Sequence, residues 1–503
     1  MGGNGLLGQL DINTEAAFTI ASVVTVFFFI LHWVIVVGLG LRIILKRRPT
    51  GVSLAWLLVI GSVPFAGAVL YLFVGELWLP KNRIERYKAF KDSIASHIER
   101  IDHAWDVTGD ELSPLARSLN AQANSPLELS AVGGNAIELF DRSELCINAI
   151  VEDIDNAKSS VSMSFYIWQS GGHVELVEAA LIRAVERGVV CRVMLDCAGS
   201  KKFIRKKGFF QMRDGGVEVL TTLPAGLFRV LFARIDIRNH RKIITIDHDI
   251  AYTGSMNMVD PKRFKSKAGF GQWVDVMARV RGPAARVLDM TSNLDWAMET
   301  HDDQGFEMQS LMASQPVEPK GEIPMQVVPS GPDQGARVIH DMLLTLIYTT
   351  TERLIITTPY FIPSEAMLTA MTAAAMRGVQ LTLVVPKKID SVLVRHASKS
   401  YFQDLLEAGV EIRSYRGGLL HSKTVTADGQ VALLGTVNMD KRSFSINFEV
   451  SLFAYDEEFV QQMCTLQESY IEDSDEVDLN EWMSRSVMAR IVQNSVQLLA
   501  PIL

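Results

Sequence analysis

Cysteine is scarce in this sequence, and the few cysteines present lack a metal-binding arrangement. The 503 residues include only 4 cysteines, at positions 146, 191, 197 and 464. No two of them form a Cys-x-x-Cys motif, and none has the spacing to a histidine that zinc sites show. The sequence therefore predicts no zinc site, and nothing else in it indicates another metal or a cofactor.

An excess of basic charge is also absent. The chain has 49 lysines and arginines against 57 aspartates and glutamates, which gives a net charge of −8. Domains that bind nucleic acid through its phosphates usually carry the opposite balance. We therefore expect no nucleic-acid partner.

No lysine or arginine precedes Arg42, so the first hydrophobic stretch lacks the basic region of a secretory signal peptide. That stretch, Ala16–Leu45, contains only His32 and Arg42 as ionisable residues. A second stretch at 52–79 is nearly as apolar. Each exceeds the roughly 20 residues that a membrane-spanning helix needs. We predict a multi-pass transmembrane hairpin over residues 16–80, with two buried core helices as the alternative.

The cations around this hairpin do not decide its orientation. The cluster at 42–48 would place the turn in the cytoplasm by the positive-inside rule. A second cluster at 81–91 follows the second stretch closely and argues for the opposite orientation. The side of the membrane on which the rest of the chain lies therefore stays open.

Composition and periodicity divide the remaining sequence. After an N-terminal tail at 1–15 and the hairpin, residues 81–129 are expected to form a charged juxtamembrane helix and a Ser-, Asn- and Pro-rich linker. Two stretches, 130–315 and 320–480, share one alternation of helices and strands, which predicts two α/β repeats with parallel-rich sheets. An amphipathic helix at 481–503 is expected to pack on the protein, with membrane contact as the alternative.

The first repeat carries an additional apolar segment with interspersed arginines, Leu223–Arg234. We expect it either to lie in the membrane interface beside the active site or to form a buried connecting helix. The second repeat has no counterpart of this segment.

One pattern, H-x-K-x4-D, occurs twice in the chain, once in each repeat. Six residues after each copy comes a small polar cluster that contains a serine or threonine and an asparagine. Two copies with matched residue types in matched order indicate one active site built from two halves. The residues of the pattern are His240, Lys242 and Asp247 in the first copy and His421, Lys423 and Asp428 in the second.

The residues of this pattern suit chemistry on a phosphodiester. β-Branched residues follow each His-x-Lys and predict strands, and side chains two apart on a strand face the same way. One pocket would then hold two imidazoles and two cations. The cations can stabilise charge on the phosphate oxygens, while one histidine attacks phosphorus and the other protonates the leaving oxygen.

Further residues are expected to support the two histidines. Asp275, downstream of His240, and Glu449, downstream of His421, are assigned as acceptors that orient the imidazoles. The aspartates of the pattern are expected to structure the following turn rather than to contact substrate. The residues of the polar clusters that are expected to bind the phosphate or to orient other groups are Ser255, Asn257, Thr436 and Asn438.

The doubled motif resembles the phospholipase D superfamily, and the resemblance covers about residues 130–480. Three stretches narrow it to bacterial cardiolipin synthases of the phospholipase D type: Asn239–Lys242, Tyr252–Pro261 and Gln272–Asp275. The resemblance implies two α/β repeats packed on a pseudo-twofold with a shared active site, in an enzyme of the bacterial inner membrane. It also implies transfer of a phosphatidyl group between two phosphatidylglycerol molecules, with His240 as nucleophile and His421 as acid.

Other activities would use the same residues. A hydrolytic phospholipase D would pass the phosphatidyl group to water and release phosphatidic acid, and another membrane phosphatidyltransferase would use a different alcohol. A nuclease of the superfamily is disfavoured by the acidic balance and the hydrophobic stretches. A scaffold without activity would be expected to have lost a motif residue, and none is lost.

The sequence of neither repeat contains a metal-ligand cluster, so we expect the activity to be independent of a metal ion. Activity should survive EDTA treatment after thorough washing, because imidazoles and ammonium groups supply the proton transfers and positive charge of the reaction. Lipid product formation before and after chelation measures this. Loss of activity that one divalent ion restores, with lipid phase behaviour controlled, would contradict it.

Overall fold

The computed structural model of this chain describes residues 5–46, 50–75, 83–90, 105, 107, 110–127, 129–223, 236–300, 317–333 and 337–497. The chain separates into two units. One is an N-terminal helical unit, which lies within residues 5–75, and the other is a larger α/β unit with both copies of the motif.

Within the described residues, one helix is long and apolar enough to cross a membrane. Helix α1 covers Gly5–Leu45, so it begins upstream of the expected start at Ala16, and the expected N-terminal tail is helical from Gly5. Its part Thr19–Leu45 has a mean hydropathy of 2.6 and an exposed surface. Such a surface is stable in lipid rather than in water.

The second apolar stretch does not form one continuous helix, in contrast to the hairpin expected from the sequence. The chain breaks before Pro64, where proline cannot donate the hydrogen bond that would continue the helix. Gly67 permits a close approach here, since a Cβ at this position would lie 2.7 Å from the carbonyl oxygen of Val59. The turn at 47–49 lies outside the described residues. The pieces are helices α2 (Thr50–Ser62) and α3 (Pro64–Leu70) and the π-helix η1 (Tyr71–Gly75).

The α/β unit begins with a helical segment at 83–90, and helix α5 (Pro114–Leu127) follows. The first repeat then contains β1 (Val132–Phe140), α6 (Ser143–Asn156), β2 (Ser160–Phe165), α7 (Val174–Glu186), β3 (Val190–Asp196), η2 (Phe203–Arg205), α8 (Lys207–Asp214), β4 (Glu218–Thr222), β5 (Ile243–Ile246), β6 (Ile250–Gly254), η4 (Ser266–Ala268), β7 (Trp273–Val274), β8 (Met277–Arg281) and α9 (Pro283–Thr300).

The second repeat contains β9 (Ile323–Ser330), α11 (Val338–Thr349), β10 (Arg353–Thr357), β11 (Phe361–Ile362), α12 (Glu365–Met376), β12 (Gln380–Pro386), α13 (Val392–Ser400), α14 (Phe402–Glu407), β13 (Glu411–Tyr415), β14 (Leu419–Leu420), β15 (Thr424–Ala427), β16 (Val431–Gly435), β17 (Met439–Asp440), α15 (Lys441–Ser445), β18 (Glu449–Ala454) and α16 (Glu457–Glu472). The chain ends with β19 (Ser474–Glu476), α17 (Leu479–Met483) and α18 (Val487–Gln497).

The two repeats share one sheet of 15 strands. Strands β9 and β1 pair antiparallel at its centre. From there the order on one side is β18, β16, β15, β10, β12, β13 and the additional edge strand β19, and on the other side it is β8, β6, β5, β2, β3 and β4. Equivalent strands of the two repeats therefore occupy equivalent places, and the predicted α/β fold with two repeats is confirmed.

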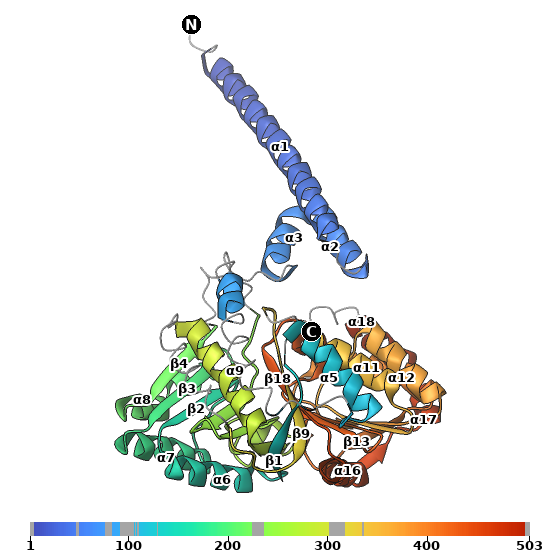
Figure 1. Ribbon diagram of the computed structural model, residues 1–503. Helices are drawn as coiled ribbons and strands as arrows, with labels where there is room; N and C mark the ends of the chain where they lie inside the picture. The colour runs from blue at the N-terminus through green and yellow to red at the C-terminus, as the bar shows by residue number, and fades with distance from the viewer. Residues whose placement is uncertain are drawn as a thin grey trace. The chain divides into compact units, whose positions relative to one another are not determined.

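Helices cover both faces of this sheet (Figure 1). On one face, α6, α7 and α8 enclose an apolar core with the strands of the first repeat, and α5, α11, α12 and α14 enclose another with those of the second. On the other face, α9 and α16 pack over the central strands of both repeats. The core under α9 and α16 is shared, so the repeats form one packed body.

Three expectations about elements were wrong or incomplete. The expected linker contains helix α5, because Leu115, Leu119 and Ala123 give it an apolar face that is buried beside α11. The central strands β1 and β9 were not predicted. The C-terminal helix begins at Val487, and its outer apolar side chains are exposed rather than packed on the core.

The aspartates of the two motifs occupy equivalent hairpin turns. Asp247 and Asp428 both have φ near 50°, in the turns that follow β5 and β15. The carboxylate of Asp247 accepts hydrogen bonds from the backbone N–H groups of residues 158–160, at 2.7 to 3.0 Å. Asp428 accepts the same set from residues 351–353, at 2.7 to 2.9 Å. Each carboxylate thus fixes the start of the neighbouring strand.

Loss of this charge should destabilise the protein without removing the turn. Asp247→Asn keeps a residue that tolerates a positive φ but weakens charge-assisted hydrogen bonds that are worth about 1–3 kcal/mol. We expect a lower melting temperature for this variant in detergent.

The same contact predicts a pH dependence of stability. Burial acts to raise the pKa of Asp247, but the backbone hydrogen bonds outweigh it and lower the pKa. A depressed pKa stabilises the folded state above the unfolded pKa of about 3.9, and this stabilisation is lost as pH falls through the folded value. The variant should therefore lose less stability than the wild type on acidification below about pH 4. Equal losses would contradict this role.

Candidate active site

Each histidine of the motif is held by the backbone of the opposite repeat. Asn239 forms a parallel bridge with Phe448, and the N–H of His240 donates to the carbonyl of Phe448 at 2.9 Å. In the second copy, strand β14 pairs in parallel with β7, and the N–H of His421 donates to the carbonyl of Val274 at 2.7 Å. The two copies are therefore placed in one site by reciprocal strand contacts.

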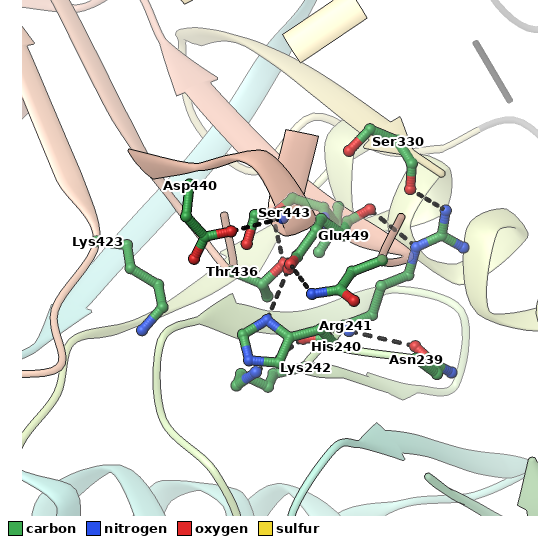
Figure 2. Close-up of polar contacts among 12 residues, drawn as sticks. Asn239, His240, Arg241, Lys242, Ser330, Lys423, Thr436, Asp440, Ser443 and Glu449 are labelled. Carbon is green, nitrogen blue, oxygen red and sulfur yellow. Dashed lines mark hydrogen bonds and ion pairs between the residues drawn. The ribbon is translucent and has the colours of Figure 1, made fainter. Parts of the chain in front are cut away.

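The carboxylates that orient the imidazoles are exchanged between the repeats as well. Nδ1 of His240 lies 2.8 Å from Oε2 of Glu449, and Nδ1 of His421 lies 2.6 Å from Oδ1 of Asp275. The sequence order suggested that each acid serves the histidine of its own repeat, and the structure pairs them the other way. All four side chains are buried. The contact between His240 and Glu449 is drawn in Figure 2.

The serine and threonine of the polar clusters support these carboxylates. Oγ of Ser255 donates to Oδ1 of Asp275 at 2.7 Å, and Oγ1 of Thr436 accepts from the N–H of Val450, next to Glu449, at 2.9 Å. Both side chains are fully buried. Of the two roles expected from the sequence, these contacts favour orienting the carboxylates over binding the phosphate.

Arg241, which was not among the residues predicted from sequence, also positions Glu449. Its Nε donates to the backbone carbonyl of Glu449 at 2.9 Å (Figure 2). Its Nη1 forms an ion pair with Asp295 at 2.5 Å. The guanidinium is completely buried between the two repeats. An arginine between the histidine and lysine of the motif was a visible signal, but its partner could not be read from sequence.

The charges of the site are set by burial and by mutual contact. Burial lowers the pKa of His240 and His421, the latter to about 4, although the carboxylates oppose this. Burial alone would raise the pKa of Asp275 and Glu449, but the histidines and lysines outweigh it and hold both low. At neutral pH the site thus contains ionised carboxylates and neutral imidazoles.

This charge state fixes the tautomer of each ring. An ionised carboxylate only accepts hydrogen bonds, so the proton of a neutral imidazole must lie on the Nδ1 atom that faces it. The Nε2 atoms of His240 and His421 then carry lone pairs. Each Nε2 can attack phosphorus or take up a proton.

The two lysines lie behind the histidines. Nζ of Lys242 donates to the carbonyl of His240 at 2.7 Å, and Nζ of Lys423 donates to the carbonyl of His421 at 2.6 Å. Burial lowers the pKa of Lys242 to about 8 and that of Lys423 to about 7. The protein thus compensates the ammonium charges incompletely, and an anionic ligand would stabilise them.

Both histidines line one cavity of about 340 Å³. The asparagines of the two polar clusters line it too. Nδ2 of Asn257 and Oδ1 of Asn438 are buried without a hydrogen-bond partner in the described structure, which suits them to a ligand. Asp247 and Asp428 do not line this cavity. The lining residues include Tyr166, Arg238, His240, Asn257, Trp273, Tyr360, His421, Asn438 and Asp440.

Three aromatic residues of the cavity were not assigned from sequence. The ring of Tyr166 packs edge-on against His240 at 5.1 Å, and the ring of Trp273 lies 4.5 Å from that of His421. Tyr360 donates to Asp390 at 2.7 Å. Tyr166 and Tyr360 each follow the equivalent strand, β2 or β10, so an aromatic residue soon after that strand in both repeats was a signal that could have found them.

Within the described residues, no group of three or more His, Cys, Asp or Glu side chains is arranged to hold a metal ion. The donors that converge on the cavity are imidazole, amide and ammonium groups. Such a set favours an anion with several oxygen acceptors.

Comparison with known families gives two matches. A family described as "Cardiolipin synthase, PLD-like domain" matches residues 150–266 and 343–469. Residues 33–76 match a family described as "Phospholipase_D-nuclease N-terminal". The first match covers both copies of the motif up to and including the polar cluster of each.

Curated relatives extend the likeness over nearly the whole chain. Cardiolipin synthase A of Serratia proteamaculans is 42% identical over 472 residues, which are 94% of this chain and 97% of that one. Cardiolipin synthase A of Proteus mirabilis is 40% identical over 486 residues, 97% of this chain and 99% of that one. Among solved structures, the phosphatidylserine synthase of Haemophilus influenzae has a TM-score of 0.53 at 15% identity and covers 77% of this chain and 98% of its own, which shows a shared fold.

The lowered pKa values predict that anion binding takes up protons. A bound anion stabilises the charged forms of His421 and Lys423 and so raises their pKa values. Sulfate, which does not titrate near neutral pH, should therefore bind with net proton uptake at about pH 7. Calorimetry in buffers of different ionisation enthalpy measures this uptake.

Lys423→Met serves as the comparison for the sulfate experiment. The variant lacks one of the titrating groups, so it should take up fewer protons per bound sulfate than the wild type. If sulfate bound to the wild type without proton uptake, or with proton release, the assignment of neutral imidazoles and partly deprotonated lysines to the site would be wrong.

Proposed function

The chain belongs to the cardiolipin synthase family, and we propose that it transfers a phosphatidyl group from one phosphatidylglycerol to a hydroxyl of a second, giving cardiolipin and glycerol. The observation that carries this proposal is the reciprocal pairing of His240 with Glu449 and His421 with Asp275 around one cavity. Two equivalent Nε2 atoms at one cavity suit a reaction in which one group leaves a phosphorus atom and another replaces it.

In the first step, Nε2 of His240 attacks the phosphorus of the donor lipid. A P–N bond forms, the P–O bond to the glycerol headgroup breaks, and His421 gives its Nε2 proton to the departing oxygen. His421 must be protonated for this step. Since burial lowers its pKa to about 4, the charge of the bound phosphate has to raise it.

In the second step, a hydroxyl of the second phosphatidylglycerol takes the place of the glycerol. It gives its proton to Nε2 of His421 and attacks phosphorus, and the P–N bond to His240 breaks. Atoms and charges then return to the starting state. The histidines are each used twice, as expected when forward and reverse steps share one geometry.

The remaining site residues are proposed to act on the phosphate oxygens. Lys242 and Lys423 supply positive charge from behind the histidines, and Asn257 and Asn438 present amide groups to the cavity. Charge that develops on the non-bridging oxygens is stabilised by such fixed groups at little reorganisation cost. Asp247 and Asp428 are proposed to act on the fold alone.

The assignment to His240 and His421 predicts the loss of activity on substitution. His240→Ala and His421→Ala should each reduce cardiolipin formation by several orders of magnitude, because each removes a group that one step requires. His248→Ala is the matched control, since His248 pairs with Asp289 outside the cavity. Mass spectrometry of the products from pure phosphatidylglycerol is the measurement.

Two results would contradict the proposal. Retention of a tenth or more of the wild-type rate in either variant would exclude the two-histidine mechanism. Phosphatidic acid as the main product of the wild type, in place of cardiolipin, would assign a hydrolytic activity instead.

The N-terminal unit associates the protein with the membrane, and we propose that its second apolar stretch crosses the bilayer again. Helix α1 packs against α2, and Ile43, Ile60 and Tyr71 form a buried apolar cluster between the segments. The stretch from Thr50 to Gly75 is apolar throughout despite its break. A second crossing would return the chain to the side from which α1 began.

Cysteine accessibility tests the second crossing. In a Cys197→Ser background, Thr50→Cys and Leu72→Cys, both at exposed positions, should react with a membrane-impermeant reagent from opposite sides of sealed vesicles. Cys146, Cys191 and Cys464 are buried, so they leave the background low. Labelling of both positions from the same side would show that the second stretch enters the bilayer without crossing it.

A further inference from the structure

Large apolar side chains are exposed on the α/β unit mainly in one place. In the described part of this unit, 13 such side chains are exposed, and six of them belong to helices α13 and α18. The other seven lie singly on seven different elements, as is normal for a protein surface. The six form what we call the α13–α18 surface, and they are Val392, Leu393, Val487, Met488, Ile491 and Val492.

The exposed side chains of α18 form one stripe along the helix. Met488 and Ile491 are 68% and 53% exposed, and Val487 and Val492 flank them at helical spacing. The helix is held to the protein by other residues. Gln493 is buried, and Val496 packs against the core of the second repeat. The stripe therefore faces away from the protein core.

This surface adjoins the cavity that contains the two histidines. Ser391 caps helix α13 by accepting the N–H of Val394 at 3.3 Å, and both residues line the cavity. Val392 and Leu393 lie between them in the sequence and are exposed. Helix α18 packs against α13. The apolar surface thus extends outward from the wall of the active site.

Cations accompany the apolar stripe. They are Arg395 and Lys399 on α13, Arg490 on α18 and Arg485 just before it. In the described part of the chain none of the four forms an ion pair, whereas other surface cations such as Arg183 and Lys387 do. Burial and then the charges of Arg395 and Arg485 lower the pKa of Lys399, so these three cations lie near one another, in a pocket that Asp478 and Glu481 also line.

We propose that the α13–α18 surface is a bilayer-binding surface, with its apolar stripe at the level of the acyl chains and its cations at the phosphates of anionic lipids. An amphipathic helix with cations beside its apolar face binds a membrane interface in this way. The surface then places the cavity mouth against lipid, where a headgroup enters directly from the bilayer. This inference rests on the proposed function, since it supplies the reason for a lipid at the cavity.

A second copy of the chain is the other occupant to consider for an apolar surface. The unpaired cations argue against it, because two copies related by symmetry would bring like charges together. They match the phosphates of phosphatidylglycerol instead. The bilayer is therefore the occupant that both the apolar and the charged parts of the surface favour.

The first test measures lipid contact directly in the full chain reconstituted into phosphatidylcholine and phosphatidylglycerol vesicles. A Met488→Cys variant in a Cys197→Ser background carries a bimane label, and lipids brominated along the acyl chain serve as quenchers. A label at Met376→Cys is the control, because Met376 is 74% exposed on α12. Strong quenching at residue 488 and little at residue 376 is expected. Equal quenching at both positions, or none at 488, would overturn the proposal.

The second test measures the use of this contact in turnover. Met488→Gln with Ile491→Gln should reduce cardiolipin formation on vesicles about tenfold, because the apolar contribution to interfacial binding is lost. On detergent-dispersed phosphatidylglycerol this double variant should match the wild type. Leu176→Gln with Met376→Gln removes two exposed apolar side chains elsewhere and should leave both rates unchanged.

The outcomes separate this inference from the proposed function. A wild type that makes no cardiolipin in detergent refutes the proposed function, while the quenching result still decides the lipid contact. Unchanged rates of the double variant on vesicles, or equal losses on vesicles and in detergent, overturn the bilayer-binding surface. Shielding of residue 488 that depends on protein concentration rather than on lipid would assign the surface to a second copy and overturn it as well.

Discussion

The arrangement of this enzyme depends on two buried contacts between its repeats, His240 with Glu449 and His421 with Asp275. Neither repeat contains a complete pair, so neither can orient its own imidazole. Removal of either histidine would leave a buried carboxylate without its hydrogen-bond donor, which costs about 1–3 kcal/mol and more for a charged group. The shared sheet and the shared core under α9 and α16 keep the repeats in the register that these contacts need.

The burial that makes these hydrogen-bonded contacts necessary also favours the binding of a phosphate. Desolvation keeps the imidazoles neutral and weakens the hold of the lysines on their protons. A phosphodiester brings the negative charge that restores the charged forms. Binding of the substrate phosphate thus raises the pKa of His421 and allows it to be protonated. This proton is the one that the first chemical step requires.

Much of the site could be predicted from the sequence, because the motif brings its own local structure. The β-branched residues after each His-x-Lys form β5 and β15 as expected. The exchange of Asp275 and Glu449 could not be predicted, since sequence order reports only distances along one repeat. Tertiary pairing decides it instead, through contacts of β7 with β14 and of Asn239 with Phe448.

The failure to predict β1, β9 and α5 also has specific physical reasons. Strand β1 contains Gly133 and Gly134, and β9 contains Pro324 and Pro329, residues with low strand propensity. Their position at the centre of the sheet, where each strand is paired on both edges, overrides that propensity. Helix α5 was not predicted because its serines and asparagines are typical of a linker, although leucines at helical spacing form its buried face.

In the proposed mechanism, His240 binds phosphorus covalently before the second lipid arrives. The stereochemical course at phosphorus tests it most directly, with phosphatidylglycerol made chiral at phosphorus by sulfur and oxygen isotopes. Two successive in-line displacements, first by His240 and then by the incoming hydroxyl, predict cardiolipin with retained configuration at the transferred phosphorus. Inverted configuration would mean a single direct displacement and would contradict the phosphohistidine intermediate.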